Sequence, residues 1–489
     1  MNLKQLLKGI AEIDTDIEVG GLCLDSRKLK MGEVFIALNG ALQHGMAHAR
    51  QAIENGASAI IYDPAGMDNP AQPAFPVPAI AITNLAQQLG ELAARFYAHP
   101  SRQVDLIGIT GTNGKTTCSQ LIAQALPDCG IIGTLGWGEP GNLNATLNTT
   151  PDALAVQHIL RTLVDQGKRA IAMEVSSHGL EQGRVNGVDF KGAVFTNLSR
   201  DHLDYHGDMR AYLQAKLTLF GNPALQFAVI NLDDEAAPQV LATLSESVVR
   251  WTFSTSGRHM QGAQCLTANN VRHDHAGISF DVHWGERSAR AHTAVVGAFN
   301  VQNVMTVLCV LLAMDWPFDK AIAQLAHLKP VIGRMEKFGG QNQPLVIVDY
   351  AHTPDALEKI LQAARGNGQL WVVFGCGGDR DKGKRPEMGR IAEKHADHVI
   401  ITDDNPRSEA SETIIADILA GCSSDNVSAI GDRNIAITTA IRQAGKNDCV
   451  VIAGKGHESY QETNGVKIPF SDQAVAQQAL AQWSPKSCS

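Results

Sequence analysis

Short apolar runs alternate with amphipathic helical stretches over most of the chain. From residue 104 the apolar runs are "VDLIGIT", "RAIAMEV", "GAVFTNL" and "FAVINLDD", and stretches such as "KTTCSQLIAQAL" lie between them. This alternation predicts parallel strands joined by crossover helices, the pattern of an α/β fold. Between residues 248 and 297 strand-like runs follow one another directly, which predicts an antiparallel insertion. The apolar run "VMTVLCVLLAM" (304–314) is too short to span a bilayer and predicts a buried helix.

Two breaks divide this pattern into three parts. A Pro-rich stretch (62–80) predicts a loop inside the first part, and a helix over 84–100 should be stopped by Pro100. The stretch "LKPVIGRMEKF" (328–338) predicts a hinge, after which the α/β pattern restarts with "LWVVFGCGG" and "DCVVIAG". The 489 residues suffice for about three domains of ~150 residues. We therefore expect domains over 1–99, 100–329 and 330–489.

Composition and charge narrow the class of protein. Hydrophobic residues make up 44% and charged residues 19%, as in soluble globular proteins. The net charge of −9 and the absence of a dense basic stretch argue against nucleic-acid binding. The nine cysteines are scattered without a CxxC pair, which argues against a disulfide framework or zinc ribbon and favours a reducing cytoplasm. The first 16 residues meet acids before any long apolar run, so no signal peptide is expected.

The stretch "LIGITGTNGKTTC" (106–118) is the strongest local signal. A β-branched strand enters a glycine turn, and Lys115 and Thr116 open a helix. Glycines let backbone N–H groups face phosphate oxygens, the lysine adds charge, and a threonine hydroxyl can bind Mg²⁺. Ile109 replaces the first glycine of the general pattern, so the loop is GxxGK[ST]; a chance glycine turn is the alternative. The loop therefore predicts a phosphate-binding site at the parallel sheet of the central domain.

Several polar residues near strand ends are candidate metal ligands. Glu174 ends an apolar strand and could hold the Mg²⁺ of a nucleotide, or cap the next turn. His202 and His206 have the i,i+4 spacing of zinc ligands, but no HExxH motif is present, and magnesium near a phosphate is favoured for His202. Lys216 lies on a helix, where the pattern alone predicts a solvated side chain.

Further charged loops follow the strands of both α/β parts. Ser176, His178, Gln182 and Arg184 could line an anionic substrate. Asn300 and Asn303 start a helix as caps or as ligand contacts. Arg334 can hold phosphate and Asp349 ribose hydroxyls. The loop 374–388 is a cationic patch or a solvated loop, with the cations Arg380, Lys382, Lys384 and Arg385.

Taken in order along nearly the whole chain, these motifs resemble the Mur ligase family of peptidoglycan synthesis, and within it the members that add diaminopimelate. The resemblance rests on "LDSRKLKMGEVFIALNG", "GTNGKTT", "NTTPD", "MEVSSHGL", "TNLSRDHLDYHGDM", "AKLTLF", "GAFNVQN", "GRME", "VDYAHTPDALE", "GCGGDRDKGKRP", "DNPR" and "GKGHE". It implies a cytoplasmic acid–amino-acid ligase of cell wall biogenesis. The expected reaction uses ATP and Mg²⁺ to join meso-2,6-diaminopimelate to UDP-N-acetylmuramoyl-L-alanyl-D-glutamate through an acyl phosphate. We expect a monomer with no nucleic-acid or membrane partner.

The resemblance also implies roles for matching residues. The N-terminal domain would bind the UDP part. The central domain would be a P-loop ATPase with a parallel sheet, and the C-terminal domain, a Rossmann-like α/β domain, would bind the amino acid. Expected ATP contacts are Gly111, Thr112, Asn113, Gly114, Lys115, Thr116, Thr117, Asn300, Arg334 and Asp349. Expected contacts to the UDP substrate are Leu24, Ser26, Asn148, Thr149, Thr150, Ser176, Gln182 and Arg184. Catalysis would involve Lys115, Glu174, His202 and Lys216, and the metal ligands would be Thr116, Glu174, His202 and Lys216 as N6-carboxylysine.

"DNPR" decides the expected amino acid. Diaminopimelate differs from lysine by one distal carboxylate, and the planar fork of Arg407 suits a carboxylate. The alternative is a surface arginine paired with Glu409. The implied diaminopimelate contacts are Arg380, Asp404, Asn405, Pro406, Arg407, Gly454 and Glu458. Rival hypotheses are a lysine-adding ligase, a folylpolyglutamate synthase, a nucleotide-driven switch and a zinc hydrolase.

Overall fold

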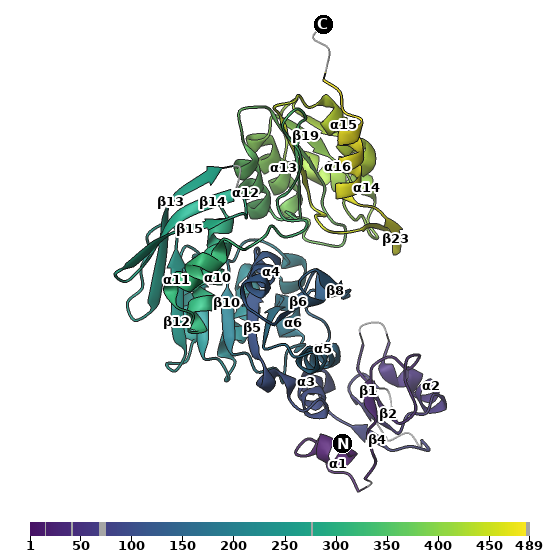
Figure 1. The fold of residues 1–489 in the computed structure, drawn as a ribbon. Coiled ribbons are helices and arrows are strands. Elements are labelled where there is room, and N and C mark those ends of the chain that lie inside the picture. Colours follow the sequence, from purple (N-terminus) through teal and green to yellow (C-terminus); the bar gives the residue numbers. More distant parts are fainter. Residues whose placement is uncertain (15, 41–42, 68–74, 275–276, 486–489) are drawn as a thin grey trace. The chain divides into compact units, whose positions relative to one another are not determined.

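The structure, a computed structural model, describes all residues except 15, 41–42, 68–74, 275–276 and 486–489, so part of the predicted Pro-rich loop lies outside the described residues (Figure 1). Two compact units are present. The first comprises Met1–Gly108, Pro127–Ala193 and Thr218–Gln226, and the second Ile109–Leu126, Val194–Leu217 and Phe227–Ser489. Their division passes through β5 (Asp105–Thr110) and β10 (Gly192–Phe195). Both units mix helices with parallel strands, so the predicted α/β class is confirmed.

The first unit begins with a small parallel sheet in the order β1-β2-β3-β4. Its strands are β1 (Gly21–Cys23), β2 (Glu33–Ala37), β3 (Ala59–Tyr62) and β4 (Ala79–Ala81), and the helical segments are α1 (Leu3–Leu7), η1 (Gly45–His48), α2 (Ala49–Glu54), α3 (Leu85–Phe96) and η2 (Pro100–Gln103). α3 ends at Phe96, before the predicted stop, because Ala98 and His99 adopt left-handed backbone angles ahead of Pro100.

The rest of the first unit supplies a second set of strands. β6 (Cys129–Gly133) pairs in parallel with β9 (Ala170–Glu174), whereas β7 (Gly136–Glu139) and β8 (Asn142–Asn144) are antiparallel. The helical segments are α5 (Ala153–Asp165), α6 (Ser177–Glu181) and η3 (Thr218–Gly221). Side chains cap two of them: Asp152 accepts from the amide of Ala155, and Ser176 from that of Gly179.

In the second unit, β11 (Phe227–Asn231), β12 (Val249–Ser254) and β13 (Gln264–Asp274) are parallel, and β14 (Gly277–Trp284) and β15 (Arg287–Thr293) are antiparallel. The antiparallel insertion is thus present, but β12 does not belong to it. Helices α10 (Asn300–Ala313) and α11 (Phe318–Leu325) pack against β11–β12 and β15 (Figure 1). The apolar run predicted as a buried helix lies in α10. The remaining helices are α4 (Lys115–Ala125), α7 (Leu203–His206), α8 (Met209–Leu217) and α9 (Ala237–Thr243).

The C-terminal part of the second unit is a doubly wound sheet in the order β16-β17-β21-β18-β19-β20. Its strands are β16 (Glu336–Gly339), β17 (Leu345–Asp349), β18 (Leu370–Phe374), β19 (His398–Ile401), β20 (Val427–Ala429) and β21 (Cys449–Ala453). One face packs on α12 (Pro354–Ala364), α13 (Lys384–His395) and α14 (Ser411–Leu419). The other packs on α15 (Arg433–Gln443) and α16 (Asp472–Ala481). A hairpin of β22 (Tyr460–Thr463) and β23 (Val466–Pro469) completes the part.

This topology gathers polar loops at one edge. Five of the six strands run in parallel, so the loops after β17, β18, β19 and β21 leave the sheet at the same side. Asp349 is the last residue of β17, and the loops after β18, β19 and β21 carry Arg380, Arg407 and Glu458. In open α/β sheets, ligands bind outside the carboxyl ends of the strands.

Two further observations concern the described residues. None of their helices is both long and apolar enough to cross a membrane. Their eight cysteines are all free thiols.

One buried ion pair joins the two helices on the second face of the C-terminal sheet. Arg433 and Asp472 are both fully buried, and the guanidinium donates two hydrogen bonds of 2.8 Å to the carboxylate. Asp472→Asn should lower the free energy of unfolding by about 3–5 kcal/mol, because a buried cation loses its partner charge. Urea denaturation measures the change.

Lys394→Met is the matched control. Lys394 and Glu358 lie 3.5 Å apart with exposed side chains, and such pairs contribute less than about 1 kcal/mol. Equal effects of the two substitutions would contradict a stabilising role for the buried pair.

Candidate active site

The glycine loop before α4 is built for close backbone contacts. Gly111 and Gly114 have φ angles of +144° and +87°. A Cβ on Gly111 would lie 1.9 Å from the hydroxyl oxygen of Thr196, and one on Gly114 would lie 2.7 Å from Asn303 Oδ1. Only glycine therefore fits both positions. α4 begins at Lys115, so the loop leads into a helix N-terminus, where N–H groups favour an anion.

Two lysines converge on one carbonyl of this loop. Lys115 Nζ donates to the carbonyl oxygens of Gly111 and Thr112, each at 2.8 Å, and Lys216 Nζ donates to that of Gly111 at 2.9 Å. Lys216 is 1% exposed and lies 4.2 Å above the Tyr212 ring, so the solvated side chain predicted from the helical pattern is wrong. Burial, and next the charge of Lys115, lower the pKa of Lys216 well below its usual range. Both causes act against the charged form of the amine.

Asp201, which sequence reasoning missed, is the centre of a buried charge cluster. Its carboxylate lies 3.2 Å from Lys384 Nζ, 3.3 Å from His202 Nε2 and 3.6 Å from His352 Nε2. Burial alone would raise the pKa of Asp201, but these neighbours, Lys384 foremost, hold it well below its usual range. Lys384 is itself buried, so the cluster joins α13 to the segment before α7.

The two histidines with zinc-like spacing do not form a metal site by themselves. The ring centres of His202 and His206 lie 6.0 and 5.1 Å from that of Tyr212. Among the described residues, no group of three or more His, Cys, Asp or Glu side chains is placed to hold a metal ion.

Arg334 and Asp349 lie at the edge of the C-terminal sheet. Arg334 Nη2 donates to Thr116 Oγ1 at 3.0 Å, and its guanidinium lies 4.5 Å from the centre of the Tyr350 ring. Both oxygens of Asp349 accept backbone N–H groups, from Met335 at 2.8 Å and Ala351 at 2.7 Å. Arg334 thus lies beside the glycine loop, whereas Asp349 holds the backbone at the start of β16 by hydrogen bonds.

Asn300 does not cap α10, whose N-cap is Phe299. Its side chain donates to the carbonyl of Val296 and accepts from Asn303, both at 2.6 Å. The cap interpretation of Asn300 is therefore wrong, because its side chain bonds the carbonyl of Val296 and the side chain of Asn303 and makes no cap bond at the start of α10.

Further contacts join the glycine-loop side of the second unit to the C-terminal sheet. Asn113 Nδ2 donates to Asp355 at 3.0 Å, and Arg200 Nε donates to Asp381 at 3.0 Å. Apart from Asn113, these residues were not predicted. Their only sequence signal was their place within or beside the motifs "SRDHLDYH", "VDYAHTPD" and "GDRDKGK".

In the first unit, the end of β9 gathers five predicted residues: Thr149, Thr150, Ser176, Gln182 and Arg184. Thr150 Oγ1 donates to the Glu174 carbonyl at 3.0 Å and accepts from the amide of Ser176 at 2.9 Å. Arg184 donates to the Thr150 carbonyl at 2.8 Å and to Gln182 at 2.6 Å.

The remaining predicted residues of this unit have different environments. The fully buried Glu174 accepts from the amide of Thr134 at 3.0 Å and from its hydroxyl at 2.9 Å, and Thr149 bonds the same hydroxyl. Asn148 is exposed. In the loop after β1, Leu24 is half-buried, and Ser26 is buried and donates to Gln51 at 2.7 Å.

Arg407 is not a surface side chain paired with Glu409. Its Nη1 donates to the Gly378 carbonyl at 2.6 Å, and its Nε lies 3.8 Å from a Glu462 oxygen. Glu409 is bound instead by Arg385 at 2.8 Å, which lowers the pKa of that carboxyl to about 2. Arg407 has a φ of +52°, and its N–H and C=O bond Glu462 and Asn464 of the β22–β23 hairpin.

The cationic patch predicted over residues 380–385 does not form as a unit. Lys384 is buried against Asp201, and the fully buried Arg385 bridges Glu409 and Asp417. Arg380 is exposed and bonds the carbonyl of Asp379 at 2.8 Å. Lys382 lies 3.1 Å from Glu409, so it shares this acid with Arg385, whereas Lys384 and Arg380 contact other groups.

Asp404, Asn405 and Glu458 meet beside Gly454. A Cβ on Gly454, whose φ is +118°, would lie 2.4 Å from an Asp404 oxygen. Asn405 Nδ2 donates to Glu458 at 2.9 Å. Pro406 is buried between Asn405 and Arg407 in the same turn.

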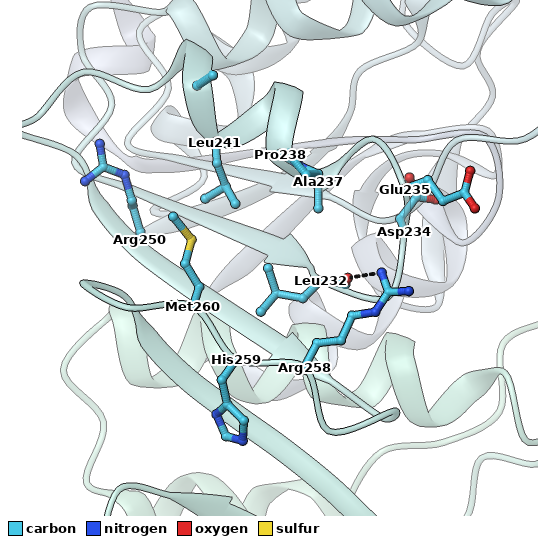
Figure 2. Close-up of a pocket in the computed structure, with 11 residues that line it drawn as sticks. Leu232, Asp234, Glu235, Ala237, Pro238, Leu241, Arg250, Arg258, His259 and Met260 are labelled. Carbon is cyan, nitrogen blue, oxygen red and sulfur yellow. Dashed lines mark hydrogen bonds between the residues drawn. The ribbon is translucent and has the colours of Figure 1, made fainter.

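A separate cavity of about 540 Å³ lies beside α9, and none of the predicted site residues lines it. Leu232, Leu241 and Met260 form its apolar wall, and Arg258 donates to the Leu232 carbonyl at 3.1 Å (Figure 2). It is thus distinct from the candidate active site.

A strand–glycine loop–helix with a lysine at the helix start is the arrangement of a nucleotide-binding α/β enzyme. The chain belongs to the Mur ligase family, so the predicted resemblance is confirmed. Three descriptions within that family match it: "Mur ligase family, catalytic domain" over residues 18–97, "Mur ligase middle domain" over 109–311, and "Mur ligase, glutamate ligase domain" over 333–456.

Relatives of known name match over nearly the full length. UDP-N-acetylmuramoyl-L-alanyl-D-glutamate–2,6-diaminopimelate ligase of Pseudomonas aeruginosa is 46% identical, covering 99% of each chain. The ligase of the same name from Ralstonia nicotianae is 50% identical over 94% of this chain and 93% of its own. A solved structure with this enzyme name has a TM-score of 0.68 and 36% identity, covering 98% of this chain and 99% of its own.

One histidine at the site generates a pH prediction. His457 Nδ1 is buried without a hydrogen-bond partner, and burial, with Arg334 and Lys455 nearby, lowers the pKa of His457 from 6.5 to about 3. Between these pH values the unfolded chain binds a proton that the folded chain does not. Stability therefore falls as pH drops below 6.5, by at most about 1.4 kcal/mol per pH unit from this group.

His457→Gln should remove this contribution. Urea denaturation between pH 7.5 and 4.5 should show a smaller loss of stability in the variant than in the wild type, with a constant difference above pH 7. Parallel pH profiles throughout would contradict the lowered pKa.

Proposed function

We propose that this chain is an ATP-dependent ligase that adds meso-2,6-diaminopimelate to UDP-N-acetylmuramoyl-L-alanyl-D-glutamate in peptidoglycan precursor synthesis. The full-length relatives of that name support the reaction. The structural observation that carries the proposal is the Arg407 guanidinium, which is held on the Gly378 carbonyl in the turn that also carries Asn405, whose amide bonds Glu458. A guanidinium in this turn can form two parallel hydrogen bonds to a carboxylate, and the distal carboxylate is the group that diaminopimelate has and lysine lacks.

The reaction has two steps. The carboxylate of the UDP-peptide attacks the γ-phosphorus of ATP and ADP leaves, which gives an acyl phosphate. The amine of diaminopimelate then attacks the acyl carbon, phosphate leaves, and the amine proton passes to solvent or a nearby base. Lys115 and the loop amides of Gly111–Thr117 would offset charge on the transferring phosphoryl group. Asn300, Arg334 and Asp349 would bind the rest of ATP.

Magnesium would be held by Thr116, Glu174, His202 and a carboxylated Lys216. A hydroxyl and two carboxylates are hard oxygen donors, which suit this ion. When bound, Mg²⁺ supplies charge neutralisation at the phosphates. The lowered pKa of Lys216 supports the modification, because only an uncharged amine can add to CO₂, releasing a proton and leaving a carboxylate on a long arm.

The other two substrates would lie at the remaining residue groups. The cluster at the end of β9, with Leu24, Ser26 and Asn148, would bind the UDP-muramoyl-dipeptide. Gly454 and Glu458 would hold the distal amino and carboxyl groups of diaminopimelate, together with Asp404 in the adjoining turn. Arg407 and Asn405 would bind the distal carboxylate, and Arg380 would lie near the other carboxylate. We retain domains over 1–99, 100–329 and 330–489, within which the three matched family regions fall. We further propose a cytoplasmic monomer without nucleic-acid or membrane partners.

ADP release with candidate amino acids, each with and without the UDP-muramoyl-dipeptide, tests the function. Release that requires both the dipeptide and meso-diaminopimelate supports it. A preference for lysine or a folate substrate would favour another ligase of the superfamily. ATP hydrolysis without either co-substrate would favour a nucleotide-driven switch.

Arg407→Ala should raise the KM for meso-diaminopimelate at least tenfold, equivalent to about 1.4 kcal/mol. The charge-assisted contact to the distal carboxylate is lost, whereas the KM for ATP should stay within twofold. Initial rates of ADP release give both constants. Arg390→Ala, at an exposed position on α13, is the control and should change neither. An unchanged diaminopimelate KM in Arg407→Ala would exclude this role.

Lys216→Ala should lose most turnover, on the order of a hundredfold or more, because no carboxylate can form at that position. Short carboxylic acids such as acetate should restore part of the rate. Lys320→Ala, on the exposed face of α11, should remain active with or without acetate. Full activity of Lys216→Ala would refute the proposed modification.

A further inference from the structure

A fully buried lysine lies directly behind the proposed amino-acid site. Lys455 follows β21, is 0% exposed, and was not among the predicted site residues. Its Nζ donates to Asn405 Oδ1 and to Glu458 Oε2, both at 2.9 Å. An ammonium group is costly to bury unless it is paired and hydrogen-bonded. Here both recorded acceptors belong to residues that we assign to substrate binding.

These hydrogen bonds determine which atom of the Asn405 side-chain amide is available to a ligand. Oδ1 accepts from Lys455 Nζ and from the amide of Glu462, each at 2.9 Å, so both of its lone pairs are used. Nδ2 donates one hydrogen to Glu458 Oε2 and keeps the other. Asn405 can therefore offer a ligand only a donor.

The same bonds orient Glu458. Its Oε2 accepts from both Lys455 and Asn405, so Oε1 is the oxygen left for a ligand. The side chain retains 17% exposure. The loop pair thus presents one donor, suited to a carboxylate, next to one acceptor, suited to an ammonium group.

We propose that Lys455 is a specificity-determining residue: by fixing Asn405 as a donor and offsetting the charge of Glu458, it matches the site to an amino-acid end that carries both an ammonium and a carboxylate group. This inference rests on the proposed function. Lys455 touches no substrate itself and acts through the two side chains that it holds.

The charges of the site indicate which amino acid should be favoured when Lys455 is lost. Arg407 faces Glu462 at 3.8 Å, the buried Arg433 is bound by Asp472, and Asp404 adds a carboxylate. Replacing Lys455 by a neutral residue makes the site more negative by one unit, independently of the charges of these neighbouring side chains. Lysine carries one more positive charge than diaminopimelate, and charge differences act strongly in a poorly solvated site. Loss of Lys455 should favour lysine.

Steady-state kinetics on the full-length protein test this. The readout is the ratio of the inhibition constant of L-lysine to the KM for meso-diaminopimelate. Lys455→Met should lower the ratio at least tenfold, while the KM for ATP stays within twofold. Lys467→Met is the matched control, since Lys467 also lies over the Tyr460 ring, at 4.2 Å compared with 5.7 Å for Lys455, but is exposed on β23. It should leave the ratio unchanged.

Glu458→Gln provides an independent test with the opposite sign. The substitution makes the site more positive by one unit, and the lost ammonium contact is common to lysine and diaminopimelate. The ratio should therefore rise, even though both ligands bind more weakly. This variant decides the matter if Lys455→Met does not fold.

The outcomes separate the two proposals. If the wild type forms no product from diaminopimelate, the proposed function fails. If the wild type is active but Lys455→Met keeps its ratio, or changes it only as much as Lys467→Met, the inference is overturned. A fall of the ratio in Glu458→Gln would overturn it as well.

Discussion

The carboxylate of Asp201 is the contact on which the arrangement of the second unit depends. It is almost fully buried and meets a lysine from α13, a histidine that follows β17 and its own neighbour His202. A buried charge of either sign is stable only while its partners stay in place. The segment before α7 and the loops after β17 and β18 are thereby held together. The approach of Arg334 to Thr116 and of Asp355 to Asn113 follows from the same alignment.

Local signals allowed much of the fold and the glycine loop to be predicted. A strand, a turn that requires two glycines and a helix start all lie within 13 residues, so no distant contact is needed to recognise them. The doubly wound C-terminal sheet was equally readable, because strands buried on both faces are continuous apolar runs. The antiparallel insertion was predicted one strand too early, since β12 and β13 differ in pairing but not in residue type.

The charged residues were less predictable, because their partners come from distant segments. Lys216 has the spacing of a solvated helical residue, and its burial depends on Gly111, more than 100 positions away. Lys384 and Arg385 look like neighbours in one cationic patch, yet α13 directs them to different acids. Lys455 was visible only as part of the motif "GKGHE", since its role depends on Asn405, in a loop from another strand. A sequence pattern indicates the average exposure of a residue type, whereas the folded protein gives each buried charge its own specific partners.

The left-handed backbone of Arg407 has a consequence for how such a site changes in evolution. A non-glycine residue with positive φ is strained by roughly 1–2 kcal/mol, and the hydrogen bonds to Glu462 and Asn464 of the hairpin offset that strain. The strained turn at Arg407 and the hairpin are therefore expected to be kept or lost together. A lineage that abandons the arginine loses the reason to keep the strained turn, so drift in the hairpin should follow. Restoring the arginine to such a chain would then also require the hairpin that supplies the bonds to Glu462 and Asn464.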